Sequence, residues 1–130
     1  MSLVLLCALY FGAGINHFWH PKAYWDLIPP YFPFNHAINI AAGLFEFFCG
    51  ILMIIPPTRK IGAVLIIIML IAFIPAHIYM IQKGGCISSR MCVPAWIAWM
   101  RLFPLQFILM WWAWKTYKWN SIMQHHLAKV

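Results

Sequence analysis

The chain has 130 residues, of which 65% are hydrophobic and only 8% are charged. A compact water-soluble domain of this size cannot bury so much apolar surface, so the composition excludes an ordinary soluble protein and predicts an integral membrane protein. The formal net charge is +7, but the nine basic residues are scattered and form no stripe. We therefore expect contact with anionic membrane lipids and no nucleic-acid partner.

Four apolar stretches approach the length of about 20 residues that a helix needs to cross a bilayer. They cover residues 2–18, 38–55, 61–82 and 95–114. The first lacks a preceding basic region and a clear cleavage site, so we interpret it as a retained helix and not as a signal peptide. Strand-like segments of alternating polarity do not recur. The sequence predicts an all-α fold, with residues 1–130 forming one polytopic four-helix bundle in the membrane.

A polar, proline-rich segment follows the first predicted span. The run from Pro21 to Leu27 predicts a short amphipathic helix on the membrane surface, with proline in its first turn. Pro29 and Pro30 then end this helix, because proline cannot continue one. Together with Trp25 and Asp26, these residues are expected to form a lid over the outer end of the bundle.

One face of the second predicted span is small and polar. Such a face usually marks close contact between membrane helices, because small side chains let two backbones approach. The only acidic residue within the spans lies on this face and is expected to point into the bundle. The residues that recur at three- and four-residue steps are Asn39, Ala42, Gly43, Glu46, Cys49 and Gly50.

Ionisable side chains within the spans are candidates for a functional site, because they are costly in hydrocarbon. Helical rise places Glu46 about 15 Å from the outer end of its helix, and Arg101 and His77 each about 10 Å from the outer ends of theirs. His17 lies near the outer surface. We expect these residues to converge in a polar pocket in the outer half of the bundle, with Gln106 as a further candidate.

Several interpretations of this convergence stay open. Glu46 and Arg101 either form a buried ion pair that only stabilises the bundle, or line a ligand pocket, or are solvated separately. His17 and His77 superficially resemble two axial haem ligands, but a lone histidine in a membrane is more often a packing residue, so haem is disfavoured. No metal site is expected from the spacing of the cysteines.

The loop from Gly84 to Cys92 contains two of the four cysteines. If it faces an oxidising compartment, Cys86 and Cys92 can form a disulfide. Free thiols and a redox-active pair are the two alternatives. Cys7 and Cys49 lie within predicted spans, where buried thiols are ordinary packing residues.

Basic residues in the loops favour one orientation over the other. The side that holds both termini is richer in lysine and arginine, which predicts cytoplasmic termini and, in a bacterium, the inner membrane. Asp26 would then lie outside and pair with Lys22 or Arg90. The basic residues are Arg59, Lys60, Lys115, Lys118 and Lys129 on the inner side, against Lys22, Lys83 and Arg90 on the outer side.

Three segments resemble the DoxX-like family of small four-helix membrane proteins: AGINHFWHPKAYWDLIPPYFP, GLFEFFCGILMIIPPTRKIGA and VPAWIAWMRLFPLQFILMWWAW. That family has a G-x-x-H-F segment followed by prolines, a glutamate in the second helix, and an R-x-P-L-Q type fourth helix. The resemblance implies quinone-linked sulfur chemistry, a membrane oxidoreductase complex that answers oxidative stress, or, as in distant animal relatives, receptor assembly. The positions that it implies are His17, Pro29, Pro30, Glu46 and Arg101.

Two functions compete. The first is an accessory subunit that binds a quinone or another small molecule in membrane redox or stress physiology, with Arg101, His77 or His17 hydrogen-bonding a quinone carbonyl and Glu46 as proton acceptor. No autonomous catalytic motif is present, so enzymatic activity stays open. The alternative is a non-catalytic assembly or chaperone-like module that binds a partner protein, a lipid or its own copies through small-residue faces, such as that from Ala8 to Gly12.

Overall fold

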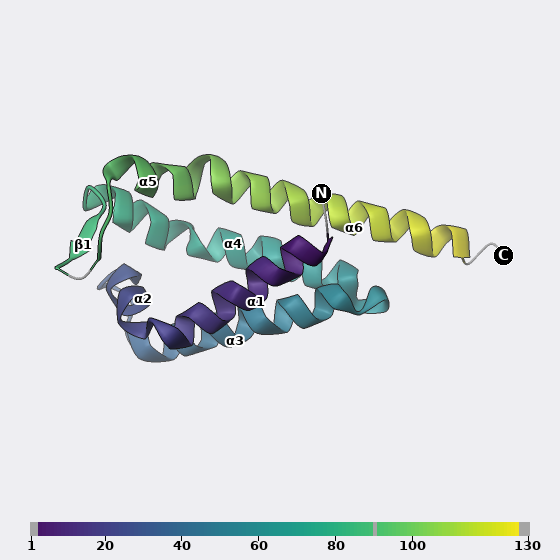
Figure 1. Ribbon diagram of the computed structural model, residues 1–130, viewed down its shortest axis with the longest axis horizontal. Coiled ribbons are helices and arrows are strands. Elements are labelled where there is room, and N and C mark those ends of the chain that lie inside the picture. Colours follow the sequence, from purple (N-terminus) through teal and green to yellow (C-terminus); the bar gives the residue numbers. More distant parts are fainter. Residues whose placement is uncertain (1–2, 90, 128–130) are drawn as a thin grey trace.

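The computed structural model describes residues 3–89 and 91–127, and these are predominantly helical (Figure 1). The all-α prediction is therefore confirmed, with one small hairpin as an addition. The elements are α1 (Leu3–Trp19), α2 (Pro21–Leu27), α3 (Asn35–Ile54), the 3-10 turn η1 (Pro56–Thr58), α4 (Arg59–Gln82), β1 (Cys86–Ser88), β2 (Met91–Cys92), α5 (Ala95–Met100), η2 (Arg101–Gln106) and α6 (Phe107–Leu127).

The long helices lie side by side, with α1 against α3, α3 against α4, and α4 against α6 (Figure 1). The short elements α2, β1 and α5 gather at one end of the molecule, and the connection between α3 and α4 lies at the other. Helix α6 runs past this connection and extends beyond the ends of the other helices. The main core joins all four long helices through buried side chains such as Leu6, Met53, Ile66 and Trp112.

Two helices are long and apolar enough to cross a membrane within the described part of the chain. They are α3, with a mean hydropathy of 2.0, and α4 together with η1, with 2.7. Both coincide with predicted spans. The 17 residues of α1 reach the required length only together with α2, and the chain bends by 94° between these two. Length and composition thus support a membrane location.

The fourth predicted span is not one continuous helix. It begins at Ala95 as expected, but the wider turns of η2 replace regular α-helix from Arg101, and Phe103 has the extended angles φ −138° and ψ 120°. The next residue, Pro104, explains the break, because proline lacks the backbone N–H and clashes with the preceding turn. Helix α6 then continues to Leu127, beyond the predicted end at residue 114.

The predicted surface helix is present as α2, with Pro21 in its first turn. It packs against α3 and α4 across one end of the helices. The predicted pairing of Asp26 with Lys22 is wrong, because the described residues contain no ion pair between these two side chains. Instead, Ser88 Oγ donates a hydrogen bond of 2.6 Å to Asp26 Oδ2. Arg90, the other expected partner, and Lys129 lie outside the described residues.

The residues between α4 and α5, expected as a loop, form the antiparallel pair of strands β1 and β2. Cys86 and Cys92 face one another across the pair and form a disulfide. Gly84 and Gly85 make the turn out of α4 with φ values of 62° and 88°, a region that favours glycine. The hairpin contacts α2, so it supports the helix that covers the end of the bundle.

The predicted small face of α3 is buried against its neighbours, and α1 meets it at Gly14. A Cβ atom at Gly14 would lie 2.9 Å from the carbonyl oxygen of Gly43, and one at Gly43 would lie 2.7 Å from the Cβ of His17. The small residues expected on α1, Ala8 and Gly12, are instead exposed. The helices therefore approach through a glycine pair nearer the lid.

We expect Gly43→Ala to destabilise the protein by about 1–3 kcal/mol, because the added methyl group overpacks the contact between α1 and α3. Thermal unfolding in a mild detergent measures the effect. Gly12→Ala is the matched control: nothing lies within 4 Å of its added Cβ. The control should raise the free energy of unfolding by about 1 kcal/mol or less, because alanine favours helix more than glycine does. Equal effects of the two substitutions would contradict this packing.

Alkylation of the unfolded, unreduced chain should add two groups, at Cys7 and Cys49, which are the free cysteines. After reduction the same treatment should modify all four cysteines. Intact-mass spectrometry measures the number of groups added before and after reduction. In Cys86→Ser, the former partner Cys92 should become reactive without reductant. Four labelled thiols in the unreduced native sequence would exclude the disulfide.

Candidate functional site

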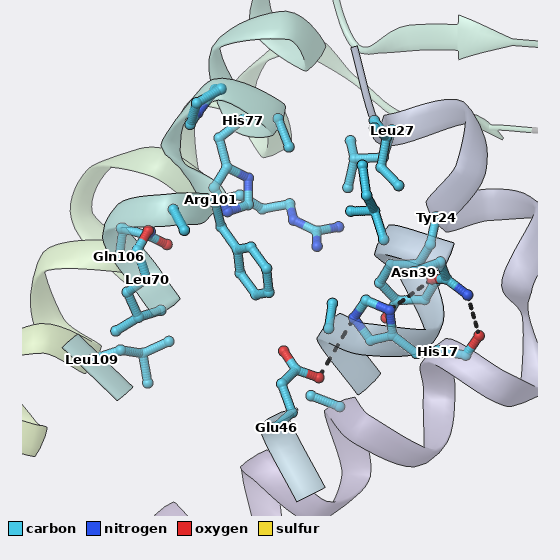
Figure 2. A pocket seen from close by; sticks show the side chains of 18 of the residues that line it. His17, Tyr24, Leu27, Asn39, Glu46, Leu70, His77, Arg101, Gln106 and Leu109 are labelled. Carbon is cyan, nitrogen blue, oxygen red and sulfur yellow. Dashed lines mark hydrogen bonds and ion pairs between the residues drawn. The ribbon is translucent and has the colours of Figure 1, made fainter. Parts of the chain in front are cut away.

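A cavity of about 590 Å³ lies beneath α2, among α1, α3, α4 and η2 (Figure 2). This volume is typical of a site for a small molecule. Its walls are mostly apolar, and a few polar side chains reach into it. The apolar lining includes Leu9, Leu27, Leu70, Phe73, Leu105 and Leu109.

All five pocket candidates named from the sequence line this cavity. They arrive from four different elements, so tertiary packing has brought them together (Figure 2). Of the four lid residues, Pro29 also lines the cavity and is buried, whereas Trp25, Asp26 and Pro30 do not line it. Trp25 instead packs on the His36 ring at a centroid distance of 3.7 Å. The five candidates are His17 of α1, Glu46 of α3, His77 of α4, and Arg101 and Gln106 of η2.

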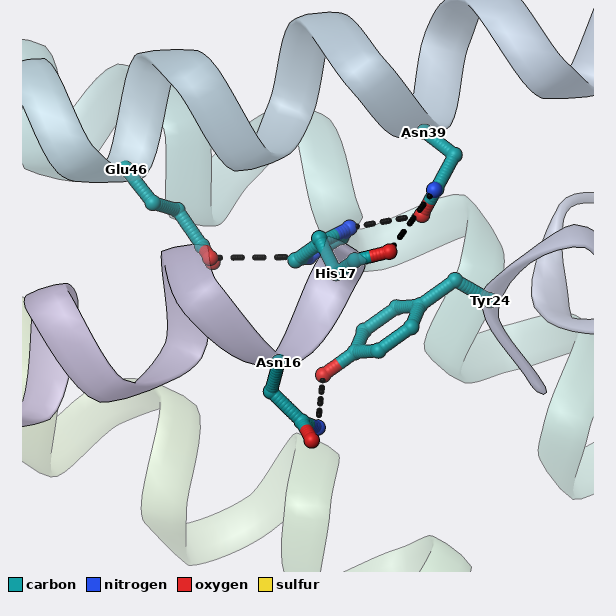
Figure 3. A network of polar contacts seen from close by, with 5 residues as sticks. All are labelled: Asn16, His17, Tyr24, Asn39 and Glu46. Atoms are coloured by element: carbon teal, nitrogen blue, oxygen red, sulfur yellow. Dashed lines mark hydrogen bonds and ion pairs between the residues drawn. The ribbon is translucent and has the colours of Figure 1, made fainter. Parts of the chain in front are cut away.

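His17 is fixed by two hydrogen bonds to Asn39 of α3 (Figure 3). Asn39 Nδ2 donates to the backbone carbonyl oxygen of His17 at 3.1 Å. The other amide atom, Asn39 Oδ1, lies 2.7 Å from His17 Nδ1 and can only accept. His17 Nδ1 therefore carries a hydrogen. The other ring nitrogen, Nε2, faces Glu46 of α3.

In the site, Glu46 contacts His17 and not Arg101, the partner that one interpretation of the sequence expected. His17 Nε2 lies 3.5 Å from Glu46 Oε2, and both side chains are buried (Figure 3). Since Nδ1 already donates to Asn39, a proton shared by the pair resides on Nε2 or on the carboxyl group. An unpaired carboxylate is costly in such a setting, so the pair is expected to hold one exchangeable proton at the cavity wall.

Tyr24 of α2 covers the other side of His17. The two rings stack with their centroids 3.7 Å apart, and Asn16 Nδ2 donates a hydrogen bond of 2.7 Å to the Tyr24 hydroxyl (Figure 3). These contacts join the end of α1 to the lid helix. Sequence reasoning did not name Tyr24 or Asn39 as site residues. The signal for Asn39 was its position on the same helical face as Glu46.

The opposite wall is formed by α4 and η2. Gln106 Nε2 donates to the backbone carbonyl of Leu70, which ties η2 to α4. The Arg101 guanidinium points into the cavity (Figure 2). No described residue accepts a hydrogen bond from it or forms an ion pair with it. Arg101 therefore offers up to five N–H donors to whatever occupies the cavity.

Three further polar atoms of the lining have no hydrogen-bond partner among the described residues. They are the Tyr10 hydroxyl, His77 Nδ1 and Glu46 Oε2, which has only its 3.5 Å contact with His17, and each side chain is more than nine-tenths buried. Buried polar atoms usually have a partner, so their gathering around one cavity indicates a site for polar atoms of a ligand. Within the described residues, no three His, Cys, Asp or Glu side chains are arranged to hold a metal ion.

The structure thus defines a helical protein of membrane-spanning character with an internal, mostly apolar cavity. Its residues 6–117 match a family described as "Domain of unknown function (DUF8561)", and the chain belongs to that family. No curated protein and no solved structure matches the chain. The family description assigns no activity, so a functional proposal depends on the geometry of the cavity.

Replacing Asn39 by alanine should destabilise the protein by about 1–3 kcal/mol, because it leaves His17 Nδ1 and the His17 carbonyl buried without partners. Thermal unfolding in detergent measures the loss. Asn35→Ala is the matched control on the same helix, because no described residue hydrogen-bonds to that side chain. If Asn39→Ala and Asn35→Ala unfold at the same temperature, the bonds between Asn39 and His17 do not hold α1.

Proposed function

We propose that this chain is an integral membrane protein that binds a quinone-like small molecule in its cavity, as an accessory subunit in membrane redox or stress physiology. The observation that carries the proposal is the Arg101 guanidinium, which is directed into mostly apolar walls and has no partner among the described residues. A quinone matches this setting because its ring is apolar and its carbonyl oxygens only accept hydrogen bonds. Arginine only donates them.

The two walls of the cavity have different roles in this proposal. Arg101 donates to one carbonyl oxygen of the quinone and fixes its orientation, while Phe73 and Leu70 pack against the ring. The pair of His17 and Glu46 lies on the other wall and holds a proton near the ligand. In this arrangement the protein binds, orients and protects the ligand from water. The electron-transfer partner belongs to another subunit.

The proposal also includes an arrangement in the membrane. The chain crosses four times as a four-helix bundle, through α1, α3, α4 and the interrupted helix of α5, η2 and α6. Both termini lie in the cytoplasm of a bacterium, and the disulfide hairpin lies in the periplasm. The loop charges support this orientation. Lys115 and Lys118 lie over the rings of Trp111 and Trp114, at 4.9 and 5.6 Å, as expected of anchors at the inner interface.

The resemblance to DoxX-like proteins supports the redox context. Its G-x-x-H-F segment supplies His17, its second-helix glutamate is Glu46, and its fourth-helix arginine is Arg101. All three line the cavity. That the three positions implied by the resemblance lie on the walls of one cavity supports a binding function.

A second candidate function is a membrane assembly module. One observation favours it: Ala8 and Gly12 of α1 are exposed, and nothing lies within 4 Å of a Cβ built at Gly12. Small residues on an exposed membrane helix allow close approach by another helix. In that case the protein would be isolated with a partner chain or with its own copies, and its cavity would not select a quinone.

Native mass spectrometry of the protein in a mild detergent with added ubiquinone tests the first proposal. We expect a one-to-one complex. Arg101→Gln should weaken binding by roughly 10- to 100-fold, because it removes a charge-assisted hydrogen bond of about 1.5–3 kcal/mol. Arg101→Lys keeps the charge without the planar fork of donors. Its affinity for ubiquinone should lie between those of the native protein and Arg101→Gln.

Arg59→Gln is the control for general effects of losing an arginine. Arg59 is the first residue of α4 and lies at the end of α3 away from the lid. There it donates to the backbone carbonyls of Met53 and Ile54. This variant should lose stability but retain ubiquinone affinity in its folded fraction. Equal affinities of the native protein and Arg101→Gln would exclude Arg101 as the ligand contact. A native protein that carries only partner chains would favour the assembly module.

A further inference from the structure

The end of the cavity covered by α2 is lined by Leu27 and Pro29, which are both buried, and by Phe32, which is 40% exposed. The lid helix is held from two directions, by the hydrogen bond from Asn16 to Tyr24 and by the contact between Ser88 and Asp26. The second contact comes from the hairpin that the disulfide closes. A ligand that arrives from water at this end would have to displace these contacts.

The flank of the cavity between α1 and η2 has less helix packing across it. Helix α1 packs extensively on α3, and η2 packs on α4, but among the described residues no comparable packing joins α1 to η2 or α6. Two cavity-lining leucines border this flank, and both are about half exposed: Leu9 of α1 at 46% and Leu105 of η2 at 47%. We call these two residues and the space between them the lateral opening.

The lateral opening lies at the depth of the hydrocarbon and not at the surface. Leu9 precedes His17 by eight residues, which corresponds to about 12 Å of helical rise away from the lid. The surrounding exposed side chains are apolar, including Leu5, Phe107 and Ile108. An apolar rim at this depth suits hydrocarbon chains and does not suit the passage of a water-soluble molecule.

From these observations we infer that the ligand is a bilayer-dissolved amphiphile that enters and leaves sideways through the lateral opening. Its polar head lies between Arg101 and the pair of Glu46 and His17, and its apolar tail extends between Leu9 and Leu105 into the lipid. This inference rests on the proposed function and narrows its ligand from small quinone-like molecules to those with a long isoprenoid tail. The Glu46 carboxyl group and the buried His77 Nδ1, which has no hydrogen-bond partner among the described residues, supply the polar end of the site.

Binding measurements in lipid nanodiscs test the inference with two probes, a ubiquinone with a single isoprenoid unit and one with a long isoprenoid tail. Compared at equal mole fraction in the bilayer, the long-tailed probe should bind more tightly, because only its tail fills the lateral opening. Leu9→Trp and Leu105→Trp place a bulky ring in that space. Each should reduce binding of the long-tailed probe by about 10-fold or more, the effect of typical overpacking.

Leu44→Trp of α3 and Ile68→Trp of α4 are the matched controls. Both positions are exposed, at 58% and 54%, and neither lines the cavity. They should bind the long-tailed probe within about twofold of the native protein, since surface substitutions away from a site have small effects. Thermal unfolding identifies any variant that does not fold, and the comparison of the two probes on the native protein needs no variant at all.

The outcomes separate this inference from the proposed function. Native protein that binds neither probe contradicts the proposed function, and the inference falls with it. Native protein that binds both probes equally well, or variants at the lateral opening that bind like their controls, overturn the inference alone. Tight binding of the long-tailed probe that is lost only in Leu9→Trp and Leu105→Trp supports sideways access from the lipid.

Discussion

The end of α1 is held against α3 by the two hydrogen bonds between His17 and Asn39, and the position of the cavity depends on this contact. The contact forms only because the two backbones approach closely at Gly14 and Gly43. Once His17 is in place, its ring provides the surface on which Tyr24 stacks, and α2 is thereby laid across the end of the helices. Its free nitrogen meets Glu46. One polar contact in an apolar environment thus positions the lid, the acid and one wall.

The chain tolerates these polar groups because most of their hydrogen-bonding capacity is used within the protein. Asn39 satisfies two polar groups of His17, and Gln106 satisfies a carbonyl of α4. In hydrocarbon each such partner removes a cost of about 1–3 kcal/mol. Arg101, the Tyr10 hydroxyl and His77 Nδ1 are exceptions that lie at the cavity, whereas Trp25 Nε1 is a buried exception outside the cavity lining. This distribution separates residues that build the site from residues that are available to a ligand.

The break between α5 and α6 contributes to the same site. Pro104 interrupts regular helix within η2, and the residues on either side of the break, Arg101 and Gln106, both line the cavity. A straight helix would have presented these positions, five residues apart, on different sides of its axis. The irregular backbone also lies beside the lateral opening, where close packing against α1 is absent from the described contacts. Irregular backbone at membrane depth is tolerated where it lines a cavity.

The sequence by itself determined the helical class, the limits of α2 and the buried face of α3. Composition predicts a membrane protein, proline sets the ends of the short helix, and the spacing of small residues marks the inward side of α3. The estimated depths also placed His17, Glu46, His77 and Arg101 near one another. Only the tertiary structure decided that Glu46 meets His17 and not Arg101, and that Asn39 and Tyr24 hold that histidine. It also decided that α1 approaches α3 at Gly14. The physical reason is that helical periodicity and rise define the direction and depth of a side chain on its own helix, whereas its partner depends on how one helix is rotated against the next.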